Sequence, residues 1–471
     1  MINQILQKSE FINTVLIFFI CAVGIMFTKG TKFVQIFHLP KAFKYAIKDD
    51  SAAVGEISGF ASLCTLLAAN IGTGNIVGVA AAVCTGGPGS IFWMIVSAFL
   101  GMATIYAEGL LAVKYRQVEK DGTISGGPFH YIEKGMGKRF KPLAVLFALF
   151  GMLAGLLGIG TVAQINGVTS AVKDFFDPNN INIVCLFGSE YSLSVVISGA
   201  IIGGSAGLVI MGGVRRIARV SEVVVPFMAV LYTFFVVAVI LCNIEKLPSA
   251  ISVIIEGAFN PSAVTGGVVG SMLTSLCTGV SKGIFSNEAG LGSAAIVAAG
   301  ARVDSPARQG LVCMLGTFID TIVMCTLTGL AIVITGAWQI PSLEGAAVTS
   351  YAFSCGLPFP PKVSSFVLML SLVFFAFTSM LGWNYYSKKC LRYLIGNKKM
   401  PLRIFDFLYV LAIFAGPYLK IDTVWQIADL FNSLMAIPNL IALTLLSDRV
   451  FCATKDFLVQ NKRKKQKFFK L

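Results

Sequence analysis

The sequence predicts an all-α polytopic membrane protein, and three observations support that fold class. Of the 471 residues, 56% are hydrophobic and 13% are charged, with a mean hydropathy of +0.80, whereas a soluble domain usually carries about 25% charged residues. The apolar residues form continuous runs, as membrane-spanning helices of about 20 residues require, and not the alternation of a membrane β-barrel. The net charge of +14 is concentrated between the runs.

Eleven apolar runs predict eleven transmembrane helices. The first, 11–28, has neither the basic leader nor the Ala-x-Ala cleavage site of a signal peptide, so it is interpreted as a retained span. The other ten are 56–84, 91–115, 142–172, 191–211, 220–242, 262–299, 310–336, 363–386, 404–419 and 423–447.

The distribution of basic residues supports this count and orients the chain. Segments that follow odd-numbered spans hold 30 of the 37 Lys and Arg residues, and segments on the opposite side hold 4. One missed or invented helix would scramble this alternation. The positive-inside rule then places the N-terminus outside and the C-terminus in the cytoplasm of a multi-pass protein of the cell (inner) membrane. The basic tail, 449–471, faces the anionic inner leaflet, and no nucleic acid is expected as a partner.

The cysteines and histidines do not predict a metal site. Most of the eleven cysteines fall within apolar runs, no Cys-x-x-Cys is present, and His38 and His130 are remote from cysteine clusters. A zinc site or a disulfide framework is therefore not expected, and no cofactor is predicted.

Two of the apolar runs are interrupted by glycine-rich segments, at 71–75 and at 283–292. Glycine lets the backbone leave helical dihedrals. With the first span set aside, the interruptions fall in the first member of each of two five-helix sets, as expected for inverted repeats with discontinuous helices that meet at the membrane midplane. This pattern divides the chain into an N-terminal helix with a basic loop, two five-helix repeats and a tail. Their ranges are 1–55, 56–242, 243–448 and 449–471.

Because unwound backbone at that depth must line protein or a water-filled cavity, the two breaks predict a binding site. Glycine is also a common packing residue in membrane helices, and packing is the favoured interpretation for Gly203, Gly204 and Gly207.

Motifs along nearly the whole chain closely resemble the alanine/glycine:cation symporter family, also called the sodium:alanine symporter family. They are 71–80 (IGTGNIVGVA), 86–94 (GGPGSIFWM), 101–108 (GMATIYAE), 126–132 (GGPFHYI), 283–294 (GIFSNEAGLGSA), 308–321 (RQGLVCMLGTFIDT), 381–386 (LGWNYY) and 435–443 (MAIPNLIAL). The resemblance implies a leucine-transporter-like fold, with five-plus-five inverted repeats preceded by one extra helix. It also implies sodium-coupled uptake of small neutral amino acids such as alanine or glycine. A proton-coupled or glutamine-preferring symporter stays open as the alternative. Departures from the family pattern at Lys282 and at Ser387 and Lys388 bear on gate pairing.

An α-amino acid is a zwitterion, so its pocket must offer donors to a carboxylate and acceptors to an ammonium group. The short helix that starts near Asn75 presents N–H groups and a positive dipole end. Carbonyls around 68–71, and those freed before Ser286, are expected to face the ammonium group or the ion. The predicted substrate-binding residues are Gly72, Thr73, Gly74, Asn75, Gln164, Phe285, Ser379 and Trp383.

Sodium prefers oxygen ligands. The resemblance implies that the carbonyls of Ala68 and Ile71 and the hydroxyls of Thr378 and Ser379 bind it. The alternative for both hydroxyls is a hydrogen bond within their own helix. Gln164 has an interhelical hydrogen bond as its alternative, and Trp383 a role as an interfacial anchor.

Four acidic residues fall inside the predicted spans and are either structural or proton carriers; they are Glu108, Glu288, Asp320 and Asp429. A channel or a membrane enzyme is disfavoured, because neither a repeated pore loop nor a paired catalytic constellation is seen. The predicted partners are a small neutral amino acid, sodium as a co-transported ion and the lipid bilayer, and the chain is expected to act as a monomer.

Overall fold

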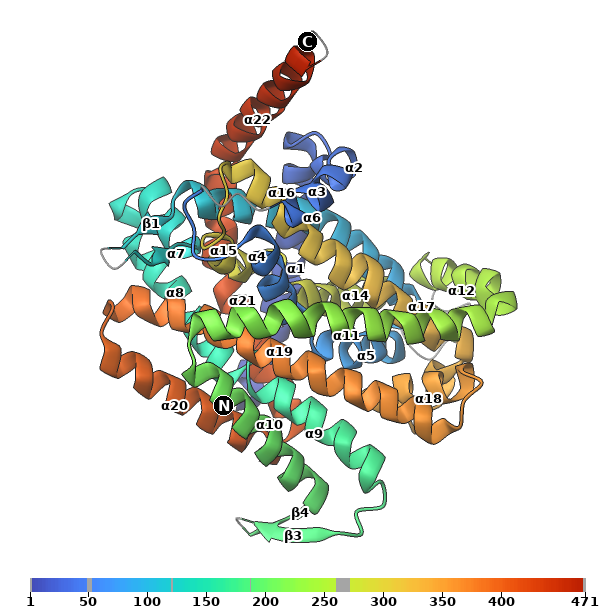
Figure 1. Cartoon of the computed structure of the whole chain (residues 1–471). Coiled ribbons are helices and arrows are strands. Elements are labelled where there is room, and N and C mark those ends of the chain that lie inside the picture. The colour runs from blue at the N-terminus through green and yellow to red at the C-terminus, as the bar shows by residue number, and fades with distance from the viewer. Residues whose placement is uncertain (1, 49–52, 120–121, 187, 260–271, 469–471) are drawn as a thin grey trace.

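The computed structural model describes residues 2–48, 53–119, 122–186, 188–259 and 272–468, most of which are helical (Figure 1). The helices of the first half are α1 (Ile2–Gly30), α2 (Val34–Phe37), α3 (Leu39–Ile47), α4 (Gly59–Asn70), α5 (Val77–Gly86), α6 (Gly89–Lys114), α7 (Pro128–His130), α8 (Lys141–Leu157), α9 (Val162–Phe176), α10 (Leu193–Met211) and α11 (Val214–Cys242). Those of the second half are α12 (Leu247–Phe259), α14 (Met272–Asn287), α15 (Ser293–Ala298), α16 (Pro306–Thr317), α17 (Thr326–Thr335), α18 (Ala346–Gly356), α19 (Pro361–Ile395), α20 (Lys399–Ala415), α21 (Ile421–Leu445) and α22 (Ser447–Phe468).

Short elements join these helices. The 3₁₀ turns are η1 (Thr73–Asn75), η3 (Lys138–Phe140), η4 (Ile244–Lys246), η6 (Ala337–Gln339) and η7 (Gly416–Tyr418), and the π-helical turns are η2 (Tyr131–Gly135) and η5 (Phe318–Cys325). Two antiparallel hairpins are formed by β1 (Gln117–Val118) with β2 (Ile124–Ser125) and by β3 (Ile183–Leu186) with β4 (Ser189–Ser192).

Within the described part of the chain, eight helices are long and apolar enough to cross a bilayer, or nine if α4 and the η1–α5 segment form one bent span. All eleven predicted runs coincide with helix, although 262–271 lies outside the described residues. The apolar part of α1, Thr14–Gly30, is shorter than these candidates. The described part of the seventh run forms the 16-residue α14, which is not one of them. The fold is thus a multi-span helical bundle, and the count of eleven stays a prediction.

Helix α6 lies in the interior and packs against α14 and α16. Glycines set these close approaches. A Cβ at Gly101 would lie 2.7 Å from the Cβ of Ala289, and one at Gly310 would lie 2.5 Å from the carbonyl oxygen of Tyr106. Small residues let membrane helices pack closely without a hydrophobic driving force between them, so α6 becomes the support on which the second broken helix rests.

The outer helices expose large apolar side chains, as lipid contact requires. Val230 and Phe234 on α11 are 69% and 66% exposed, and Phe407 on α20 is 68% exposed. Helix faces that expose several large apolar side chains are rare on a soluble monomer. The faces of α11 and α20 therefore match the predicted bilayer environment.

Six segments follow the odd-numbered predicted spans and hold most of the Lys and Arg residues. Among the described residues, five of these basic segments contact one another. Arg308 donates to the Lys48 carbonyl at 2.9 Å, Arg392 donates to Thr123 at 2.7 Å, and the rings of Tyr45 and Phe457 lie 6.3 Å apart. In Figure 1 α22, α3 and β1 lie toward the top, whereas β3 and β4 lie at the bottom. The structure thus gathers basic segments at one end of the bundle, which we call the basic end.

Candidate functional site

The first predicted break is present at the predicted position. Helix α4 ends at Asn70, η1 covers Thr73–Asn75, and the two halves are bent by 63°. The Gly72 N–H donates to the Asn75 side-chain oxygen at 3.0 Å, which holds the turn. A Cβ at Gly72 would lie 2.9 Å from the Gln164 side-chain oxygen, so a larger residue here would have to displace the Gln164 amide.

The second break is present but shorter than predicted. Helix α14 continues through Asn287, and only 288–292 leave the helix before α15 begins. The prediction that the break starts at Gly283 is wrong. A Cβ there would lie 2.8 Å from the Ser97 hydroxyl oxygen, so this glycine serves close packing. Glu288, Gly290 and Gly292 adopt positive φ angles of 58°, 87° and 82°, and these residues make the turn.

The prediction that the carbonyls before Ser286 have no partner within the helix is also partly wrong. The Ile284 carbonyl accepts from the Glu288 N–H at 2.8 Å, as in a continuous helix. The Asn287 carbonyl, at the end of α14, accepts from the Asn70 side chain at 3.0 Å. The last carbonyls of a helix have no partner inside it. The carbonyls of α14 that can accept from an ammonium group or bind an ion therefore lie after Ile284.

Asp320 joins the two breaks. Its carboxylate accepts from the Asn75 amide at 2.7 Å, from the Ser286 hydroxyl at 2.8 Å and from the Thr321 hydroxyl at 2.7 Å. It lies in the π-helical turn η5, and such turns frequently mark functional sites. The sequence singles out this residue as an intramembrane acid with a structural role as an acceptor at a broken helix, but it did not predict that side chains of both broken helices are the donors.

Gln164 lies at the first break, as predicted. Its side-chain oxygen accepts from the Thr73 N–H at 3.1 Å, and its amide donates to the Ile159 carbonyl at 3.1 Å. The interhelical hydrogen bond that was the alternative interpretation is therefore present. Gln164 is placed by a third interruption, between α8 and α9, which the sequence analysis missed. The signal was the string Gly-Ile-Gly-Thr at 158–161 inside an apolar run.

Phe285 packs beside the first break, with its ring 3.3 Å from a Cβ built at Gly74. On its other side its ring lies 4.8 Å from that of Trp425, and the Lys282 ammonium lies 4.7 Å from the Trp425 ring. A cavity of about 40 Å³ borders this cluster. That volume is close to the roughly 30 Å³ of one water molecule in the liquid, so the cavity does not admit an amino acid.

The two hydroxyls that were predicted to bind sodium have different hydrogen-bond partners. The Ser379 hydroxyl donates to the Ala69 carbonyl at 2.9 Å, so α19 and the end of α4 are in direct polar contact. The Thr378 hydroxyl bonds carbonyls of its own helix, Phe374 at 3.0 Å and Phe375 at 3.1 Å. The backbone of Ala68 and Ile71 is buried beside this contact.

Trp383 is fully buried, which excludes the interfacial-anchor interpretation. Its indole N–H donates to the Glu288 carboxylate in the second break at 2.8 Å. A Cβ at Gly160 would lie 2.5 Å from the Trp383 Cβ, so the third interruption also makes room for this side chain. The predicted side chains from Thr73 to Trp383 thus gather around the two breaks, none more than 5% exposed.

Comparison with known proteins agrees with this geometry. A model of the sodium:alanine symporter family matches residues 1–471. The sodium/alanine symporter AgcS of Methanococcus maripaludis is 44% identical over 441 residues, which cover 92% of each protein. The probable sodium/glutamine symporter GlnT of Bacillus subtilis is 36% identical over 463 residues, 97% of this chain and 90% of that protein.

Among solved structures, a crystal structure of MhsT in complex with L-phenylalanine is similar in fold, with a TM-score of 0.56 and 14% identity over 83% of this chain and 89% of that one. The bundle and its buried, doubly interrupted core are those of a multi-span membrane transporter. The chain belongs to the sodium:alanine symporter family.

Proposed function

We propose that this chain imports a small neutral amino acid, alanine or glycine, together with sodium by alternating access. Membership of the family and the identity to AgcS support this function. The proposal includes eleven spans, repeats at 56–242 and 243–448, an outside N-terminus and a cytoplasmic C-terminus. In this proposal the protein moves its substrate unchanged and is not an enzyme.

The substrate carboxylate is proposed to bind at the first break. The Thr73 N–H already donates to an acceptor, the Gln164 side-chain oxygen, and a carboxylate oxygen can take that place. The dipole of the following half-helix favours a negative charge there. Gly72, Gly74 and Asn75 shape this turn.

The remaining substrate contacts are proposed to come from Phe285, Ser379 and Trp383. The ring of Phe285 lies against Gly74 and would limit the size of the amino-acid side chain. Trp383, held by Glu288, would close the opposite side. In this proposal the two rings leave room for a hydrogen or a methyl group and exclude a long side chain.

Sodium is proposed to bind the carbonyls of Ala68 and Ile71 and the hydroxyls of Thr378 and Ser379. The contact between Ser379 and the Ala69 carbonyl supports this proposal, because it aims a hydroxyl at the carbonyl end of α4. All four ligands are hard oxygen atoms, which fit a hard cation. The Thr378 hydroxyl must turn from its own helix to join them.

The single observation that carries the proposal is the break between the end of α4 at Asn70 and the start of η1 at Thr73. It brings the carbonyls proposed for the ion and the N–H proposed for the carboxylate into one short segment, residues 68–75. An ion that orders the end of α4 would also fix the Thr73 N–H, and so complete the amino-acid pocket. A cation that enters down 100 mV gains about 2.3 kcal/mol, roughly fortyfold in accumulation.

The test is uptake of labelled alanine, glycine and glutamine into proteoliposomes with sodium outside, inside or absent. We expect alanine or glycine to accumulate only with an inward sodium gradient, and alanine to bind more tightly in sodium. Equal alanine affinity with and without sodium would contradict the coupling.

The alternative is a glutamine-preferring or proton-coupled symporter. The similarity to GlnT favours testing glutamine, and the buried Glu108, Glu288 and Asp320 favour testing protons. Uptake that follows a pH gradient without sodium, or that prefers glutamine, would select this alternative. Saturable counterflow distinguishes either symporter from a channel.

A further inference from the structure

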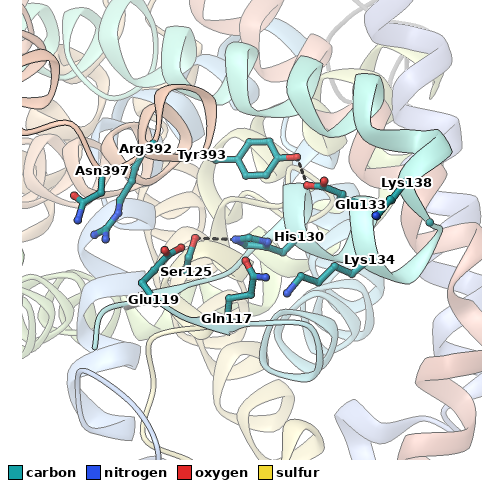
Figure 2. A pocket seen from close by; sticks show the side chains of 12 residues that line it. Gln117, Glu119, Ser125, His130, Glu133, Lys134, Lys138, Arg392, Tyr393 and Asn397 are labelled. Atoms are coloured by element: carbon teal, nitrogen blue, oxygen red, sulfur yellow. Dashed lines mark hydrogen bonds between the residues drawn. The ribbon is translucent and has the colours of Figure 1, made fainter. Parts of the chain in front are cut away.

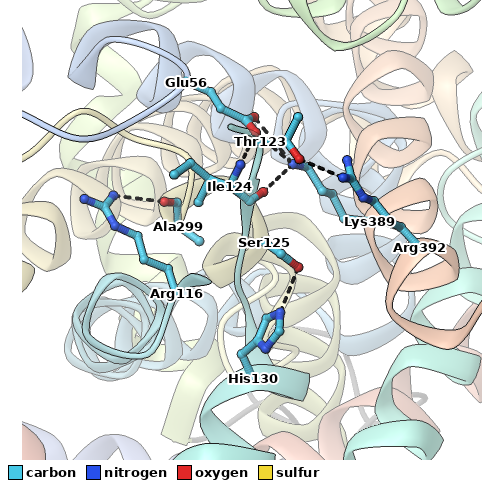
Figure 3. Close-up of polar contacts among 9 residues, drawn as sticks. All are labelled: Glu56, Arg116, Thr123, Ile124, Ser125, His130, Ala299, Lys389 and Arg392. Carbon is cyan, nitrogen blue, oxygen red and sulfur yellow. Dashed lines mark hydrogen bonds and ion pairs between the residues drawn. The ribbon is translucent and has the colours of Figure 1, made fainter. Parts of the chain in front are cut away.

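A set of contacts at the basic end joins segments that are far apart in the sequence. The β1–β2 hairpin lies between the end of α19 and the segments that flank α4 and α15 (Figure 3). Helix α4 is one half of the first broken helix and α15 one half of the second. The contacts therefore involve α4 and α15, the two helix halves that run from the candidate site to the basic end.

Lys389 is the first element of this set. Its side chain is 7% exposed, its ammonium donates to the Ile124 carbonyl at 2.6 Å, and it lies 3.4 Å from both carboxylate oxygens of Glu56. Glu56 also accepts from the Ile124 N–H. One residue of the hairpin is thus held by both members of an ion pair. Hydrogen bonds to charged groups are roughly twice as strong as neutral ones.

Arg116 is the second element. Its guanidinium donates to the carbonyls of Ala299 at 3.0 Å, Ala301 at 2.7 Å and Val54 at 2.8 Å. A cation at the C-terminal end of α15 is also favoured by the helix dipole. The segments before α4 and after α15 are further joined by backbone bonds, from Glu56 to the carbonyl of Gly300 at 2.8 Å among others.

Beside these contacts lies a cavity of about 630 Å³, lined by hairpin and α19 residues that include Ser125, Arg392 and Tyr393 (Figure 2). Much of the space between the hairpin and the end of α19 is therefore open. Packed side chains therefore do little to join the two elements on this side. The few polar contacts described above then hold the two elements together.

We propose that Glu56, Arg116, Ile124 and Lys389 form a latch that closes the candidate site toward the basic end. Release of Lys389 from Ile124 and Glu56 frees the hairpin and lets α4 and α15 separate from α19 to unload the substrate. Lys389 is a positioning residue, because it acts through these helices and touches neither proposed ligand. The inference rests on the proposed transport function, and on the charge distribution that makes the basic end cytoplasmic.

The test measures the distance between the hairpin and the first turn of α20, which follows the end of α19. Spin labels are placed at Val118→Cys and Met400→Cys, which are 60% and 69% exposed, in a full-length chain whose other exposed cysteines are replaced by serine. In Lys389→Met we expect the fraction with long label distances to rise about 10- to 100-fold, the effect of losing a hydrogen bond to a charged group.

Lys388→Met is the matched control. It removes the same charge one residue away, but Lys388 pairs with Asp406 on α20 and not with the hairpin. We expect its label distances to stay those of the parent chain, and Lys389→Arg to restore them. If Lys389→Met does not fold, Glu56→Gln weakens the same contacts with a smaller change and should open the pair in the same direction.

Label distances that are unchanged in both Lys389→Met and Glu56→Gln, or equally changed in Lys388→Met, would overturn the latch. This readout does not need transport. Opening of the latch without any sodium-dependent alanine uptake would refute the proposed function and leave the latch standing. With transport intact, Lys389→Met should weaken external alanine binding by the factor by which it lowers the closed fraction.

Discussion

Replacing Ser379 with alanine tests the ion site most directly. The change removes the hydroxyl that donates to the Ala69 carbonyl at 2.9 Å, and it leaves the packing almost unaltered. The helices cannot relax into the gap, because a Cβ at Gly382 would lie 2.8 Å from that of Ala69 and so the backbones are already in contact. The variant therefore loses one oxygen at a fixed position.

The magnitude follows from what that oxygen binds. Without an ion it makes a neutral hydrogen bond, typically about 1 kcal/mol, whereas a contact to a charge contributes about 1.5–3 kcal/mol. If Ser379 binds sodium, the sodium Kd should rise about 10- to 100-fold. A purely structural hydroxyl would lower thermal stability equally with and without sodium.

The assay is the thermal stability of the purified protein over a sodium titration with choline as the replacement cation. A ligand stabilises by RT ln(1 + [L]/Kd), so the weaker site needs about 10- to 100-fold more sodium for the same stabilisation. Ser371→Ala is the matched control, since this buried serine on the same helix bonds the Val367 carbonyl at 2.8 Å. If Ser379→Ala needs no more sodium than the parent protein for the same stabilisation, the assignment of Ser379 as a sodium ligand is refuted.

Three further changes have distinct expected outcomes. Asn75→Ala removes bonds to Gly72 and Asp320, and it should abolish sodium-driven alanine accumulation in proteoliposomes while the protein still purifies as a folded species. Trp383→Phe removes one of two side-chain donors to the Glu288 carboxylate, the other being Ser293, and should lower stability by about 1.5–3 kcal/mol, seen as a lower Tm. Burial and then the neighbouring Lys134 lower the pKa of His130 to about 4. Because the unfolded chain takes up this proton below about pH 6.5 and the folded protein does not, stability should fall as the pH drops from 6.5 toward 4, and His130→Gln should flatten that part of the Tm profile.

Sequence reasoning located the first break because its glycines flank a polar side chain in an otherwise apolar run. Gly72 and Asn75 play the parts that such a pattern predicts, close approach and closure of the turn. The second break was placed too early because glycine has two uses in membrane helices. Gly283 packs against α6, whereas Gly290 and Gly292 turn the chain. The sequence does not distinguish the two uses, since the deciding feature is the neighbour on another helix.

The hydrogen-bond partners of the polar side chains could not be predicted from the sequence for a similar reason. Gln164 was recognised as a polar residue in an apolar run, but its bond to the Thr73 N–H depends on how α9 enters the bundle. Thr378 and Ser379 are adjacent, yet one bonds its own helix and the other reaches α4. Neighbours on a helix point about 100° apart, so a motif that contains both does not show which of them faces the site.

The latch and the ion site lie at opposite ends of the same rigid element. Helix α4 has 12 residues, about 18 Å at 1.5 Å per residue, with the latch segment before its first residue and the Ala69 carbonyl near its last. Linkage requires that sodium favours the closed latch by the same factor by which the closed latch favours sodium. Lys389→Met, which removes no proposed ligand, should therefore weaken sodium binding by the factor by which it lowers the closed fraction of the label pair. Ser379→Ala should move the sodium dependence of the label distances to about 10- to 100-fold higher sodium. Unequal factors would mean that the two ends of α4 open independently, and ordering of the first break could not then be the step that couples ion binding to unloading.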